Sequence, residues 1–210
     1  MSGFRARGLA FACVALLSFV PATARGEGVI VALGDSLTAG WGVAPDEAYP
    51  ARLEMRLRRE GYTYRVINAG VSGDTTAGGL RRVDWVLHAS PAIVIVALGA
   101  NDGLRGQSPQ AMRANLEAIV RRLQAAGARV LLAGMRVPPN YGAEYTTQFQ
   151  AVFPAVARSA KVVLMPFLLD GVAADPRLNQ PDGIHPTAAG HQVIADRLWP
   201  YLRPLLGLGK

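Results

Sequence analysis

The sequence predicts an α/β fold: a three-layer sandwich in which a five-stranded parallel sheet is flanked by helices, as in flavodoxin-like domains. Short apolar runs alternate along the chain with amphipathic stretches of helical period. Three of these runs are almost entirely aliphatic, which is typical of strands covered on both faces. The expected strands are residues 28–33, 64–68, 92–98, 128–134 and 161–167.

The first 24 of the 210 residues have the pattern of a secretory signal peptide. Arg5 and Arg7 precede the apolar run "LAFACVALLSFV", and the small residues of "PATA" follow it. An uncleaved membrane anchor is the alternative, but the run is short of the roughly 20 apolar residues that span a bilayer. We therefore expect cleavage after Ala24, secretion to the periplasm, and no stable membrane anchor. The single cysteine, Cys13, lies within this segment, so the domain expected over 25–210 can form no disulfide.

Charge gives weak information about partners. The formal charge of +7 becomes +5 when Arg5 and Arg7 are removed, and the remaining excess is spread over helical stretches such as "ARLEMRLRREG" and "AIVRRLQAAG". Solvated helix faces explain this pattern, and contact with an anionic lipid surface is the alternative. No basic stretch is interleaved with aromatic residues, so we expect no nucleic acid partner.

Three amphipathic stretches are predicted as helices. The first covers residues 49–60 and stops before a glycine. The second follows Ser108, a suitable N-cap, has Pro109 in its first turn and ends at Gly127. The third covers residues 187–202. Because helices separate the strands, the strands should run parallel, and ligands should bind beyond their carboxyl ends.

The first strand ends in "GDSLTAG", which brings Ser36 to that edge. A phosphate-binding loop of the P-loop type would need G-x-x-x-x-G-K-[ST], and a dinucleotide loop would need G-x-G-x-x-G. Neither pattern is present after this strand. A flavin-phosphate loop would need aromatic residues in later strand-end loops, and "GANDGLRG" has none. A nucleophilic serine is the remaining interpretation.

A serine nucleophile needs a base, and His185 is the best candidate. It lies in the polar loop "QPDGIHPTAAG" at the same edge of the sheet as Ser36. Asp182 precedes it by three residues across a glycine turn, so its carboxylate can reach one imidazole nitrogen and leave the other for Ser36. His88 and His191 are expected to be surface or packing residues.

Two further strand-end loops could stabilise negative charge. Asn101 emerges from the strand at 92–98 and could donate its amide to an oxyanion. The loop "NAGVSGDTTAGG" contains Gly73, whose N–H can approach a ligand closely because no Cβ intervenes. Each loop alone could be an ordinary turn, but four such loops at one edge favour an active site.

The segments "GDSL", "SGDT", "GAND" and "DGIH", in this order and at these strand ends, resemble the SGNH hydrolases, also called GDSL esterases. The phrases "NDGLRG", "PPNYG" and "PDGIHP" resemble the bacterial periplasmic thioesterases, lysophospholipases and arylesterases within that family. The resemblance covers nearly all of the expected domain. It implies a Ser36–His185–Asp182 triad and oxyanion donors at the backbone of Ser36, the backbone of Gly73 and the side chain of Asn101.

The resemblance also implies where substrates bind. It assigns a mobile substrate-side loop to residues 102–107 and a border of the acyl site to residues 136–142. The substrate-binding residues expected from it are Asp102, Gly103, Leu104, Pro138, Pro139 and Tyr141.

We therefore predict a secreted hydrolase of carboxylic esters and thioesters, including lysophospholipids, that needs no metal or organic cofactor. A deacetylase of carbohydrate or peptidoglycan on the same scaffold is the alternative enzyme. A binding protein that has lost catalysis is the alternative outside enzymes.

Overall fold

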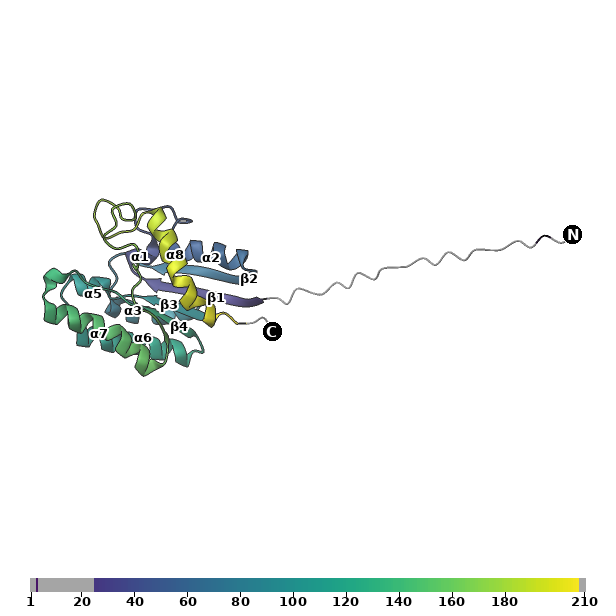
Figure 1. Ribbon diagram of the computed structural model, residues 1–210. Coiled ribbons are helices and arrows are strands. Elements are labelled where there is room, and N and C mark those ends of the chain that lie inside the picture. The colour runs from purple at the N-terminus through teal and green to yellow at the C-terminus, as the bar shows by residue number, and fades with distance from the viewer. Residues whose placement is uncertain (1–2, 4–24, 208–210) are drawn as a thin grey trace.

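The expected parallel sheet forms, with strand order β2-β1-β3-β4-β5 (Figure 1). The computed structural model describes residue 3 and residues 25–207, so the predicted signal peptide lies outside the described residues. The strands are β1 (Arg25–Gly34), β2 (Tyr62–Gly70), β3 (Ile93–Ala97), β4 (Arg129–Ala133) and β5 (Val163–Met165). This order is the flavodoxin-like one, in which the chain changes direction across the sheet between β1 and β3. The predicted fold class is confirmed.

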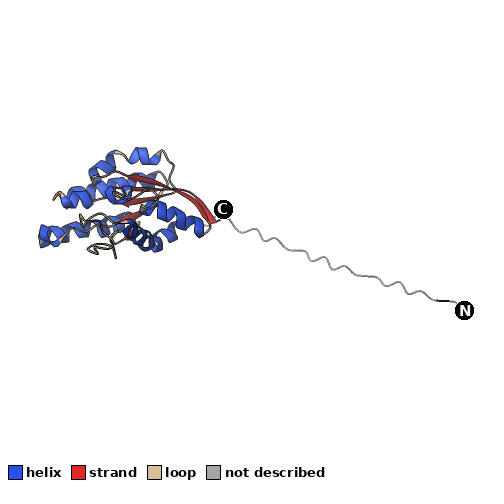
Figure 2. Ribbon diagram, turned by 90° about the horizontal axis from the view of Figure 1, so that it is seen from above, coloured by secondary structure: helices blue, strands red, loops and turns tan. Residues whose placement is uncertain are grey.

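The helices cover both faces of the sheet (Figures 1 and 2). α2 and α8 pack together on one face, while α3, α4, α6 and α7 pack on the other. The α-helices are α1 (Ser36–Ala39), α2 (Tyr49–Arg59), α3 (Thr76–Arg81), α4 (Val83–Leu87), α5 (Ala100–Leu104), α6 (Pro109–Ala125), α7 (Ala143–Ala160) and α8 (Ala188–Leu202). Two short 3₁₀ helices are η1 (Pro139–Tyr141) and η2 (Arg203–Leu205). No helix formed by the described residues is long and apolar enough to cross a membrane.

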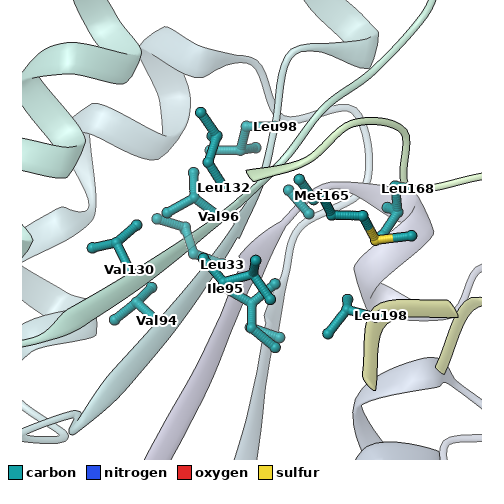
Figure 3. Close-up of a cluster of buried hydrophobic side chains, with 14 of the residues drawn as sticks. Leu33, Val94, Ile95, Val96, Leu98, Val130, Leu132, Met165, Leu168 and Leu198 are labelled. Carbon is teal, nitrogen blue, oxygen red and sulfur yellow. The ribbon is translucent and has the colours of Figure 1, made fainter. Parts of the chain in front are cut away.

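The core lies where the two helical layers meet the sheet. Every residue of β3 is buried, as expected for a central strand covered on both faces. Side chains from β1, β3 and β4 pack with the end of β5, with Leu168 beyond it and with α8 (Figure 3). The labelled members of this cluster are Leu33, Val94, Ile95, Val96, Leu98, Val130, Leu132, Met165, Leu168 and Leu198. This packing fixes the strand ends from which the loops of the site begin.

The three predicted helices form close to their expected limits. The Ser108 hydroxyl accepts the Ala111 N–H at 3.3 Å and so caps α6. The apolar stripe of α6 is buried against the sheet; it consists of Met112, Leu116, Ile119, Val120 and Leu123. The Thr187 hydroxyl caps α8 in the same way, accepting the Gly190 N–H at 3.3 Å. Helices α1, α3, α5 and α7 were not expected from the sequence pattern.

Candidate active site

Ser36 is the first residue of α1, directly beyond the carboxyl end of β1. Asp35 is the N-cap of this helix, because its Oδ1 accepts the Leu37 N–H at 3.0 Å. The N–H groups of a first helical turn have no acceptor within the helix. The serine therefore sits on a short, well-anchored turn with its own N–H available to a ligand.

His185 and Asp182 form a compact loop unit. Asp182 Oδ1 accepts the N–H groups of Ile184 and His185, each at 3.0 Å. Its Oδ2 lies 2.7 Å from His185 Nδ1. These hydrogen bonds from the His185 backbone and ring, with that from Ile184, lower the pKa of Asp182 to about 2. The carboxylate is therefore ionised at neutral pH and fixes both the backbone and the ring of His185.

Ser36 completes a hydrogen-bonded chain with this unit. Its Oγ lies 3.0 Å from His185 Nε2. Because an ionised carboxylate can only accept, His185 carries its hydrogen on Nδ1, which leaves Nε2 to accept from the serine hydroxyl. Trp41 flanks the imidazole, with 6.1 Å between the ring centroids. This is the geometry by which a histidine can take the proton of an attacking serine.

Asn101 lies on α5, at the carboxyl end of β3 and next to the strand that leads to Ser36. Its Nδ2 donates to Asp35 Oδ2 at 3.2 Å. Asp35, which caps the helix that begins at Ser36, is thus in direct contact with Asn101, the amide expected to stabilise an oxyanion. The contact spans the position between β1 and β3 at which flavodoxin-like sheets bind ligands.

Asp35 is a carboxylic acid in the protein interior. Its side chain has no exposed surface. Loss of hydration raises its pKa to about 6, although hydrogen bonds from the Leu37 N–H and the Asn101 amide favour the ionised form. It is therefore ionised at neutral pH, but at a cost in stability.

Gly73 lies in the loop between β2 and α3 with φ of +78°, a conformation that favours glycine. Arg105, which follows α5, donates from Nη2 to the Gly73 carbonyl at 3.0 Å. The Arg82 guanidinium fixes the same loop from within. It pairs with Asp74 at 2.7 Å and donates to the carbonyls of Ala69 at 2.8 Å and Gly34 at 2.9 Å. One arginine therefore joins the ends of β1 and β2 to the Gly73 loop.

The structure corrects two of the expected substrate contacts. Asp102 is 1% exposed, and its carboxylate accepts from the Thr76 N–H at 2.8 Å and the Thr76 hydroxyl at 2.5 Å. Gly103 is also buried, and a Cβ on it would lie 2.3 Å from Val137 and 2.7 Å from Phe149. Both residues belong to α5 rather than to a loop, so they pack inside the protein and do not face a substrate.

The other expected substrate-binding residues lie at the surface or partly buried. Leu104, Pro138 and Pro139 are exposed, and Tyr141 is half-buried. The Tyr141 hydroxyl donates to the Leu104 carbonyl at 2.9 Å. The Tyr145 hydroxyl donates to the Gln107 carbonyl at 2.8 Å and strengthens the same contact. The segments 104–107 and 137–145 therefore lie side by side.

The two other histidines are not part of this chain of hydrogen bonds. His88 is exposed and caps the end of α4. His191 is buried in α8, where its Nδ1 accepts the Tyr49 N–H at 3.3 Å. Burial lowers the pKa of His191 to about 4, so it is neutral at physiological pH.

Three functional candidates were missed from the sequence: Asp35, Arg82 and Arg105. The position of Asp35 before a serine is an N-cap signal, but its contact with Asn101 is tertiary. The two arginines act through carbonyl groups of distant loops, for which a single sequence carries no signal.

Comparison with known proteins gives consistent results. Residues 32–193 match the GDSL-like Lipase/Acylhydrolase family. The chain is 44% identical over 178 residues to Esterase TesA of Pseudomonas aeruginosa strain PAO1, covering 84% of this chain and 89% of that protein. It is 39% identical over 199 residues to Thioesterase 1/protease 1/lysophospholipase L1 of Escherichia coli strain K12, covering 94% and 93%. The structure of psychrotrophic esterase EstA from Pseudoalteromonas sp., inhibited by monoethylphosphonate, matches with a TM-score of 0.80 at 35% identity, covering 84% of this chain and 97% of that one.

Proposed function

Because this chain belongs to the GDSL-like lipase/acylhydrolase family and is a carboxylic ester hydrolase, we propose that it cleaves esters and thioesters with a Ser36–His185–Asp182 triad. The observation that carries the proposal is the unbroken chain of hydrogen bonds from Ser36 Oγ through both ring nitrogens of His185 to Asp182 Oδ2. Such a chain recurs on unrelated folds wherever a serine serves as acyl acceptor.

In the first half-reaction, Ser36 Oγ attacks the acyl carbonyl carbon while its proton passes to His185 Nε2. The resulting imidazolium is stabilised by the ionised Asp182. When the tetrahedral intermediate collapses, the bond to the alcohol or thiol breaks, and His185 returns the proton to that leaving group. The acyl group remains on Ser36 as an ester.

In the second half-reaction, water attacks the acyl-enzyme. His185 accepts a proton from the water and then returns one to Ser36 Oγ, so the enzyme is restored and a carboxylic acid leaves. In both halves the carbonyl oxygen becomes an oxyanion. We assign its donors to the backbone N–H groups of Ser36 and Gly73 and to the Asn101 amide.

We assign the acyl group to the apolar surface around Ser36. Four exposed apolar side chains belong to the strand-end segments of the site: Trp41, Val71, Leu104 at the end of α5, and Ile184. The paired segments 104–107 and 137–145 would border the chain, with Leu104, Pro138, Pro139 and Tyr141 in contact with it. The names of the relatives, which include a thioesterase and a lysophospholipase, agree with acyl-chain substrates.

A serine-directed probe tests the nucleophile. A fluorophosphonate should label the parent protein, and Ser36→Ala should neither react with it nor hydrolyse p-nitrophenyl butyrate, while keeping its circular dichroism spectrum. Labelling of another serine, or turnover by Ser36→Ala, would refute the triad.

A series of p-nitrophenyl esters tests the acyl site. Each buried methylene contributes up to about 0.8 kcal/mol, so kcat/KM should rise from acetyl to medium-chain esters until the surface ends. Acyl thioesters should be accepted as well. If acetate is the best substrate by a wide margin, the acyl site is wrong and the deacetylase alternative replaces it.

We also propose that residues 1–24 direct secretion to the periplasm and that one domain follows. The support is the charge and hydropathy pattern of that segment, together with the start of β1 at Arg25. Expression in a bacterium, followed by N-terminal sequencing of the periplasmic protein, should give Arg25 as the first residue. Retention of the intact chain in the membrane fraction would favour an anchor instead.

A further inference from the structure

An asparagine can stabilise an oxyanion only if its amide is turned the right way. Its Nδ2 donates hydrogen bonds, but its Oδ1 would repel a negative oxygen. The two ends have the same shape, so something must favour one orientation of Asn101 over its reverse. A partner that can only accept would do this.

Asp35 has that property. An ionised carboxylate has no hydrogen to donate, and Asp35 Oδ2 lies 3.2 Å from Asn101 Nδ2. The reversed amide would set Oδ1 against this oxygen, which is unfavourable because two oxygens that both carry negative charge would face each other without a hydrogen between them. The carboxylate cannot turn away, because its Oδ1 is held by the Leu37 N–H at 3.0 Å.

Capping α1 does not by itself require a carboxylate. Three longer helices of this chain are capped by neutral hydroxyls: Thr75 caps α3, Ser108 caps α6 and Thr187 caps α8. Asp35 has no exposed surface, so its charge is costly there. A neutral cap would avoid that cost. The contact with Asn101 explains why a second accepting oxygen is present.

We propose that Asp35 is a positioning residue for catalysis, which holds the Asn101 amide with one N–H on Asp35 and the other free for the oxyanion. The inference rests on the proposed function, since it assumes that Asn101 serves the oxyanion. Asp35 itself touches no substrate and acts through Asn101.

The isosteric variant Asp35→Asn tests this directly. An asparagine has one accepting oxygen, whereas Asp35 uses two. If that oxygen stays on the Leu37 N–H, the new NH₂ faces Asn101 and turns its carbonyl toward the oxyanion. We expect kcat to fall on the order of tenfold to a hundredfold, with KM changed less than about twofold, because the loss is confined to the transition state.

The double variant separates positioning from general damage. Asn101→Ala should lower kcat by roughly 10²–10³-fold. Asp35→Asn/Asn101→Ala should be no slower than Asn101→Ala within about threefold, because Asp35 then has nothing left to position. Ser108→Asn, which exchanges the cap of an exposed helix start, is the matched control and should keep parent activity.

The outcomes distinguish the positioning role of Asp35 from the oxyanion role of Asn101. Parent-like kcat in Asp35→Asn, or losses that multiply in the double variant, would overturn the positioning role while leaving the triad intact. Parent-like kcat in Asn101→Ala would instead refute the oxyanion assignment in the proposed function, and the positioning role with it. If Asp35→Asn does not fold, Asp35→Ser keeps a cap acceptor, removes the oxygen facing Asn101 and should give the same pattern.

Discussion

Two aspartates near the same serine have opposite environments. Asp182 lies on an exposed loop, where three hydrogen bonds from its own loop lower its pKa to about 2. Asp35 is buried beside Ser36, where loss of hydration raises its pKa to about 6. When two local environments shift the pKa values of the same kind of group in opposite directions, the two groups can take different roles. In the proposed mechanism the exposed carboxylate orients the base, and the buried one is suited to orient a neutral donor.

Asp182→Asn should slow turnover while preserving the fold. An asparagine can donate to His185 Nδ1, which favours the tautomer with a hydrogen on Nε2, and that tautomer cannot accept the serine proton. We expect kcat at pH 7 to fall on the order of 10³–10⁴-fold, measured with p-nitrophenyl butyrate. Asp175→Asn, at a half-buried carboxylate that pairs with Arg177, is the control and should keep parent activity. A loss of less than tenfold in Asp182→Asn would mean that the loop alone positions His185.

The raised pKa of Asp35 makes stability depend on pH. The folded protein binds the proton of the Asp35 carboxyl more tightly than the unfolded chain does, in which the pKa of this group is 3.8. The stabilisation from this group is therefore complete below about pH 4 and is lost as pH rises through 6, by about 3 kcal/mol in all. His191 acts oppositely, since its lowered pKa makes the folded protein lose stability as pH falls from 6.5 toward 4.

Comparison of Asp35→Asn with the parent isolates the first effect, because His191 is common to both. The difference in unfolding free energy should move in favour of the variant by up to about 3 kcal/mol between pH 4 and pH 7. Urea denaturation at half-unit pH intervals measures it. A difference that stays constant with pH would show that Asp35 titrates normally.

At the scale of elements, the site is held together through α5. This helix carries Asn101, and Arg105 follows it and holds the Gly73 carbonyl. Its position depends on Gly103, which lets the helix lie directly against Val137 and Phe149. Packing against the segment at 137–145 thus sets where the predicted oxyanion donor lies.

Gly103→Ala should therefore destabilise the protein by about 1–3 kcal/mol, the usual cost of overpacking a core. The new methyl group would lie 2.3 Å from Val137 Cγ1 unless one of the two moves. Val137→Ala removes the closer of its two tight contacts and leaves the Phe149 ring at 2.7 Å, so the double variant should be less destabilised than the two single variants added together. Additive losses in thermal unfolding would show that α5 shifts as a unit and that Val137 is not the obstacle.

Local pattern predicted some elements and not others, for physical reasons. β3 and α6 were predicted because burial on both faces and a capped amphipathic stripe leave clear sequence patterns. α7 was missed because it starts without a side-chain cap after Gly142 and contains Pro154. The segment that contains Asp102 was misassigned because a polar "NDG" looks like a loop, while the Thr76 partner that stabilises it is distant in sequence.

The predicted site followed from a rule of the whole molecule rather than from local pattern. Carboxyl ends of parallel strands share one edge, so Ser36, Gly73 and Asn101 had to be neighbours once the strands were recognised. The order of strands added the contact between Asp35 and Asn101, since it makes β1 and β3 adjacent. No sequence pattern specified that contact, because it joins residues that follow two different strands and are 66 positions apart in the chain.

The amino ends of the strands lie at the edge of the sheet opposite the candidate active site, close to the end of the described chain. There the Gly26 N–H donates to the Gly207 carbonyl at 3.1 Å, and the Gly207 N–H donates to the Tyr64 hydroxyl at 3.2 Å. β1 then runs ten residues to its carboxyl end, so about 33 Å separates this contact from Ser36. A support or fusion partner joined near residue 207 would lie at the amino-end edge of the sheet and leave the candidate active site, at the opposite edge, open to solvent. Beads coupled through that end should retain the kcat/KM of the free enzyme, whereas coupling through Arg136, beside the proposed acyl site, should not. An attachment point near Gly207 is therefore remote from the candidate active site, which makes the protein suitable for immobilisation and for display on a surface.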